Sequence, residues 1–147
     1  MKNTNQNLGT GTWTYRSLLN NPDISVDFDS LEFARANLTI VTHTDGSLTG
    51  TIGDNSGLVT DHWQLALTGS IQYGSPATLW FQGKGTGTDG TPWVYDYLCY
   101  IVPHIPNGIN QVPALVGNVT RAVAHGTGSP AGVTASFYAV LQPETNK

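Results

Sequence analysis

The sequence has 147 residues and a net charge of −4, and charged side chains make up 11% of it, against about 25% in an average soluble protein. Six scattered Lys and Arg residues argue against binding to nucleic acid, and the lack of any stretch of about 18 apolar residues argues against a membrane partner. The length suits one domain. We therefore expect a single domain over residues 1–147, with a disordered or peripheral tail at residues 1–8.

Short segments that alternate apolar and polar residues follow one another along the chain, separated by Gly, Pro, Asn and Asp. This pattern predicts strands. We expect eight of them, at residues 9–18, 32–42, 46–53, 62–73, 77–86, 91–102, 113–124 and 131–141. No segment has a convincing helical period, and residues 22–30 have room for one short helical turn at most.

The predicted fold class is all-β, an eight-stranded antiparallel up-and-down barrel. Most predicted strands have one apolar and one polar face, which is typical of antiparallel sheets, and closing the sheet into a barrel leaves no open edge. Glycines inside predicted strands, such as Gly69 and Gly117, favour the barrel because strongly curved strands use glycine at bends. A two-sheet β-sandwich is the alternative.

Three short motifs resemble the avidin and streptavidin family, a branch of the calycin barrels. They are Gly11-Thr12-Trp13, Asp45-Gly46-Ser47-Leu48-Thr49-Gly50-Thr51 and Leu67-Thr68-Gly69-Ser70, all within residues 11–75. The resemblance implies an eight-stranded barrel that binds a small molecule at its open end.

The same resemblance does not imply biotin as the ligand. The positions of the family's urea-binding Asn and Ser in strand one hold Tyr15 and Leu19 in this sequence. The positions of its Tyr and Ser in strand three hold Ile52 and Asp54. Because the polar groups that bind the urea are missing, we expect a different ligand or none.

The segment 91–102 breaks the alternation of apolar and polar residues, because both of its faces are rich in apolar or aromatic side chains. One face carries Trp93, Tyr95, Tyr97 and Cys99, and the other carries Val94, Asp96, Leu98 and Tyr100. Either one face is buried against another subunit, or the aromatic side chains line a pocket. The inward face is ambiguous by one residue.

Arg121 shares its parity with Leu115, Val119 and Val123, so the pattern directs all of them into the barrel. A buried guanidinium without a partner is costly, so it needs a carboxylate or a ligand anion. If the predicted strands 91–102 and 113–124 pair about a loop centred on Gly108, residues 95–96 lie opposite residues 120–121. Asp96 is then the nearest predicted partner, and Glu32 is the second. A structural ion pair and a polar ligand anchor both remain open.

We expect a small-molecule-binding barrel with an aromatic-lined interior pocket. The predicted ligand-binding residues are Tyr15, Trp63, Phe81, Tyr95, Tyr97 and Arg121. The alternative is a metal-independent cyclase, isomerase or lyase acting inside the barrel, with Asp96 and Arg121 as catalytic residues. A structural or assembly protein is the second alternative.

No metal and no cofactor are expected. The predicted topology separates His62 and His125 from His43 and His104 at opposite ends of the barrel. A zinc site needs three or four converging ligands, which this arrangement does not provide.

The low charge of the chain predicts a homodimer or homotetramer, and Trp80 and Tyr100 have outward parity if Phe81 and Tyr97 face inward. Cys99 is the single cysteine, so no disulfide forms within the chain. Residues 1–10 show no signal peptide, so we expect a cytoplasmic protein, although a secreted mature form with its signal removed has the same sequence features.

Overall fold

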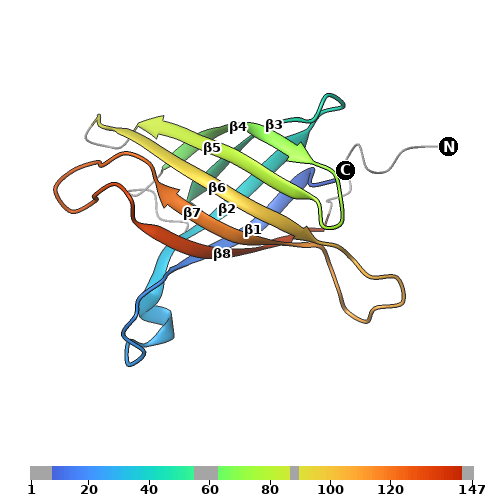
Figure 1. Cartoon of the computed structure of the whole chain (residues 1–147), viewed down its shortest axis with the longest axis horizontal. Coiled ribbons are helices and arrows are strands. Elements are labelled where there is room, and N and C mark those ends of the chain that lie inside the picture. Colours follow the sequence, from blue (N-terminus) through green and yellow to red (C-terminus); the bar gives the residue numbers. More distant parts are fainter. Residues whose placement is uncertain (1–7, 55–62, 87–89, 144–147) are drawn as a thin grey trace.

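A computed structural model confirms the all-β prediction and describes residues 8–54, 63–86 and 90–143. Its strands form one closed antiparallel barrel in the order β1 to β8, with β8 pairing back to β1 (Figure 1). The up-and-down barrel is therefore confirmed, and the two-sheet sandwich is wrong. No helix in the described part of the chain has the length and apolar character needed to cross a membrane.

The strand boundaries follow the alternating segments of the sequence. The elements are β1 (Gly11–Leu19), the 3-10 helix η2 (Phe28–Leu31), β2 (Glu32–Thr42), β3 (Ser47–Asp54), β4 (Gln64–Gln72), β5 (Thr78–Thr86), β6 (Pro92–Val102), β7 (Ala114–Arg121) and β8 (Thr134–Leu141). The β1–β2 and β7–β8 connections lie at one end of the barrel, on the left in Figure 1. The β2–β3, β4–β5 and β6–β7 connections lie at the other end.

The two largest boundary errors flank the same connection: β8 was expected to begin at residue 131 and begins at Thr134, and β7 was expected to continue to residue 124 and ends at Arg121. The backbone of Arg121 makes its last bonds at this corner, donating to the Val133 carbonyl over 2.9 Å and accepting from the Gly132 amide over 2.8 Å. The next residue, Ala122, still donates its backbone N–H to the Val94 carbonyl of β6 over 2.8 Å. The chain then leaves the sheet, so Val123, which we expected to face the core, is exposed.

Aromatic rings fill the middle of the barrel. The ring of Phe81 stacks on that of Tyr97 with centroids 4.9 Å apart, and Tyr15 packs against Phe137 at 5.0 Å. These side chains come from β5, β6, β1 and β8, so one cluster joins strands from opposite parts of the sheet. The barrel is consequently solid at mid-height.

The segment before β1 covers the end of the barrel that carries the β2–β3 turn. The indole Nε1 of Trp13 donates to the Gly9 carbonyl over 3.1 Å, and Thr42 Oγ1 donates to the Leu8 carbonyl over 3.0 Å. Leu8, which we assigned to the tail, packs against the core, whereas residues 1–7 lie outside the described residues. Any large opening must therefore lie at the opposite end.

The structure resolves the ambiguity of the segment 91–102. Tyr95, Tyr97 and Cys99 face the interior of the barrel. Asp96 lies on the outer side, where its carboxylate accepts a hydrogen bond from Gln82 Nε2 over 2.7 Å. The inward face of β6 is therefore the aromatic one.

Candidate functional site

A pocket of about 420 Å³ occupies the barrel end that carries the β1–β2 and β7–β8 connections. Five of the predicted ligand-binding residues line it, namely Tyr15, Trp63, Tyr95, Tyr97 and Arg121. The sixth, Phe81, does not reach the pocket, because it is fully buried beneath the ring of Tyr97. The structure thus brings together most of the predicted site, and its ligand-binding role stays a prediction.

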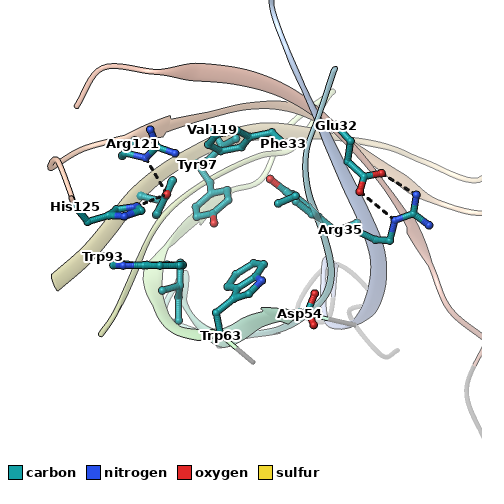
Figure 2. Close-up of a pocket in the computed structure, with 14 residues that line it drawn as sticks. Glu32, Phe33, Arg35, Asp54, Trp63, Trp93, Tyr97, Val119, Arg121 and His125 are labelled. Carbon is teal, nitrogen blue, oxygen red and sulfur yellow. Dashed lines mark hydrogen bonds and ion pairs between the residues drawn. The ribbon is translucent and has the colours of Figure 1, made fainter. Parts of the chain in front are cut away.

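Two tryptophans form one wall of the pocket. Trp63 precedes β4 and Trp93 lies near the start of β6, with ring centroids 6.5 Å apart (Figure 2). On its other side, Trp93 stacks against the imidazole of His125 at 4.4 Å and 17°. This row of flat faces gives a planar ligand a large contact area.

Sequence reasoning missed Phe33, which lines the pocket against the parity of its strand. In the β1–β2 pair, Ser17 lies opposite Ala34 but Leu18 lies opposite Glu32, so β2 has one extra residue at this point. Such a bulge changes the direction of the side chains around it. Strict alternation cannot reveal this, and no sequence signal in the segment marks the bulge.

Trp93 and His125 were also absent from the predicted ligand-binding set, although the sequence held a signal for each. Trp93 shares the parity of Tyr95 and Tyr97 on β6, so a prediction that places those two tyrosines in the pocket also places Trp93 there. His125 was expected at this end of the barrel, and the structure places it beside the pocket. His62, expected at the same end, lies outside the described residues.

Arg121 is the charged group of the pocket wall that is most deeply buried, with 8% of its surface exposed. Its Nε donates to the Tyr95 hydroxyl over 3.0 Å and its Nη1 donates to the Pro130 carbonyl over 3.2 Å. The guanidinium carbon also lies 5.2 Å from the centroid of the Phe33 ring, a cation–π arrangement. The inward direction predicted for Arg121 is therefore confirmed.

The carboxylate partners expected for Arg121 are wrong. Asp96 faces outward because it has the opposite parity to Tyr95 on β6. Glu32 instead pairs with two other arginines, accepting from Arg35 Nη2 over 2.7 Å and from Arg16 Nε over 3.0 Å. Within the described residues, Arg121 has no ion-pair partner.

A hydrogen-bonded chain links Arg121, Tyr95 and His125. The Tyr95 hydroxyl lies 2.7 Å from His125 Nε2 and accepts from Arg121 Nε. Because an arginine can only donate, the single proton of the Tyr95 hydroxyl is available to His125. The chain can therefore hold or transfer a proton at the edge of the pocket.

The opposite side of the pocket has a different electrostatic character. Figure 2 shows Glu32, Arg35 and Asp54 on this side, away from Arg121 and His125. The hydrogen bond from Arg35 is the main cause that lowers the pKa of Glu32 below its ordinary value. Glu32 is therefore ionised at neutral pH and balanced by its arginines.

The floor of the pocket is formed in part by two tyrosines. Burial raises the pKa of both Tyr15 and Tyr97 well above the ordinary value, so both hydroxyls keep their protons at neutral pH. Tyr97 is 3% exposed and directs its hydroxyl into the pocket (Figure 2). In the described part of the structure this hydroxyl has no hydrogen-bond partner, so it offers a donor to a bound molecule.

Among the described residues, no group of three or more His, Cys, Asp or Glu side chains is placed to hold a metal ion. Comparison with known proteins found no matching family model, no matching curated protein and no matching solved structure. The resemblance to avidin-like proteins is thus supported only by the closed eight-stranded barrel, which is compatible with a calycin-like fold.

Proposed function

We propose that this protein binds one small, flat and largely apolar molecule in the pocket at the open end of the barrel. The observation that carries this proposal is a pocket of about 420 Å³ whose walls and floor present six aromatic side chains. They are Tyr15, Phe33, Trp63, Trp93, Tyr95 and Tyr97. Pockets of roughly 300–1,000 Å³ with apolar walls and a few polar groups are typical small-molecule sites.

Two further features support the proposal. The Arg121 guanidinium and the Tyr97 hydroxyl are isolated polar groups in an aromatic surrounding, which is how such sites orient a ligand. The resemblance to avidin-like barrels also implies a ligand at the open end. Biotin is not proposed, because Ile52 is fully buried in the core and Tyr15 occupies the pocket floor where urea-binding side chains are needed.

Titration with the neutral fluorophore N-phenyl-1-naphthylamine tests the proposal. We expect saturable binding with energy transfer from Trp63 and Trp93, and Trp63→Ala should weaken it by about tenfold because a stacked face is lost. Trp80→Ala is the matched control, since Trp80 lies on the outside of the barrel. No saturable binding, or an equal loss in both variants, contradicts a ligand site in the pocket.

A second candidate function, proton transfer in an isomerase-type reaction, is favoured by the chain from Arg121 through Tyr95 to His125. This chain replaces Asp96, which lies outside the barrel, as the acid–base group of the enzyme alternative. Exchange of the acidic C–H protons of 2-tetralone in D₂O, followed by NMR, tests it. If the protein accelerates the exchange and Tyr95→Phe removes the acceleration, the result supports an enzyme. If the exchange proceeds at the rate in buffer, the enzyme alternative is wrong and only the binding function remains.

A further inference from the structure

The pocket contains a positive charge that no acidic side chain among the described residues neutralises. Arg121 is buried, and no carboxylate in the described residues forms an ion pair with it. Glu32, the second carboxylate expected from the sequence, is held by Arg16 and Arg35. Transferring an arginine from water to such a site is unfavourable unless a partner compensates the charge.

The pocket also has more hydrogen-bond donors than acceptors on this side. A guanidinium has five N–H donors, of which Arg121 uses one for Tyr95 and one for Pro130. The remaining donors, including both on Nη2, have no partner in the described part of the structure. The Tyr97 hydroxyl, which also has no partner among the described residues, faces inward two residues along β6 from Tyr95, the residue opposite Arg121. All of these donors are available to a hydrogen-bond acceptor on a bound molecule.

We propose that the molecule bound in the pocket carries an acid group, such as a carboxylate, which the Arg121 guanidinium binds. This inference rests on the proposed binding function and adds the chemical class of the ligand. The planar fork of arginine matches two oxygens of a carboxylate, and exclusion of water strengthens the pair. Trp63, Trp93 and Phe33 then contact the flat body of the molecule.

The distribution of charge in the pocket gives the ligand one orientation. Arg121 lies on one side, and the carboxylates of Glu32 and Asp54 lie on the other (Figure 2). On the other side Arg35 is already paired with Glu32 and Asp54 adds a like charge, whereas beside Arg121 an acid group meets a cation that has no ion pair among the described residues. The ligand's acid group therefore binds on the β6–β7 side.

Two fluorophores that differ by one acid group test this inference. 1-Anilinonaphthalene-8-sulfonate is N-phenyl-1-naphthylamine with an added sulfonate, so the ratio of their dissociation constants isolates the contribution of the anion. In the wild-type protein we expect the sulfonate to bind at least about tenfold more tightly than the neutral probe, as a charge-assisted hydrogen bond predicts. Arg121→Met should abolish this preference, so that the dissociation constants of the two probes differ by less than about twofold in the variant.

Arg35→Met is the matched control. Arg35 also lines the pocket, but its charge is paired with Glu32 at 2.7 Å, so its removal should not reduce the preference for the sulfonate. Trp80→Ala must also retain the preference, which excludes sulfonate binding on the outer surface. Equal loss in the Arg35 and Arg121 variants indicates a general charge effect and overturns the assignment to Arg121.

The two proposals fail in different ways. If neither probe binds, the proposed binding function is wrong; if the neutral probe binds and the sulfonate has no advantage, only the anion inference is wrong.

If Arg121→Met fails to fold, a competition experiment in the wild-type protein replaces it. We then expect 2-naphthoate to displace N-phenyl-1-naphthylamine at a concentration about tenfold lower than 2-naphthamide, and equal displacement overturns the inference.

Discussion

Tyr95 and Arg121 lie directly opposite each other on β6 and β7, and Arg121 Nε donates to the Tyr95 hydroxyl over 3.0 Å. This pair fixes the guanidinium at the pocket wall without neutralising its charge. It also leaves the Tyr95 proton available to His125, 2.7 Å away. One tyrosine therefore both positions the cation and connects it to a titratable side chain.

Replacing Tyr95 with Phe should lower the free energy of unfolding by about 1–3 kcal/mol. In the variant, the buried Nε of Arg121 loses its hydrogen-bond acceptor. The loss of a buried hydrogen bond lowers the free energy of unfolding more than the loss of a solvent-exposed one. Urea denaturation at neutral pH measures the change. Tyr100→Phe, on the outer face of the same strand, is the control and should stay within about 0.5 kcal/mol of wild type. Equal stability of Tyr95→Phe and wild type contradicts a structural role for this hydroxyl.

Gly117→Ala should destabilise the barrel strongly, by about 2 kcal/mol or more, because a β-carbon at this position would overlap the backbone of Leu98 and Cys99 on β6. Thermal unfolding followed by circular dichroism measures the loss. Gly128→Ala is the matched control, since nothing lies within 4 Å of its added β-carbon. A loss confined to Gly128→Ala, or absent from both, is incompatible with the close approach of β6 and β7.

Stability should fall as the pH rises above about 8.5. Burial raises the pKa of the Cys99 thiol to about 12, whereas the unfolded thiol titrates near its ordinary value of about 8.5. Between these values the unfolded chain holds fewer protons than the native one, so the free energy of unfolding declines with pH, by up to about 1.4 kcal/mol per pH unit for one group. Tyr15 and Tyr97, whose pKa values are also raised, should steepen the decline above about pH 10.

Urea denaturation at intervals between pH 7 and pH 11 checks this pH dependence. Cys99→Ala should be less stable at neutral pH because it leaves a small cavity, but its stability should decline less steeply between about pH 8.5 and 10. An identical slope in the variant and the wild type would show that Cys99 is not responsible.

We continue to expect a homodimer or homotetramer. Trp80 and Leu98 lie opposite each other on the outer face of β5 and β6, and Tyr100 and Tyr138 extend this apolar surface through β7 to β8. Sedimentation velocity at micromolar concentration should show the oligomer, and Trp80→Ser should shift it toward monomer by removing the largest of these apolar side chains. A strict monomer in the wild type refutes this prediction and, with it, the structural or assembly alternative.

The aromatic pocket was predictable to the extent that it follows alternation. Tyr15 and Arg121 lie on the inward parity of regular strands, and pairing the two segments on either side of the Gly108 loop places Tyr95 opposite Arg121. Phe33 depends on a bulge, whose position is decided by how β1 and β2 pair rather than by the residues of β2 alone.

The sequence by itself determined the all-β fold, the order of the strands and the side of β7 from which Arg121 points, because side chains alternate strictly along a regular strand. Tertiary structure alone decided which face of β6 is inward, because both faces carry apolar side chains and only closure against β5 and β7 selects one. That choice directs Asp96 outward, and among the described residues Arg121 has no carboxylate partner. Which groups Arg121 contacts depends on how neighbouring strands pack, and the sequence of one strand does not determine this.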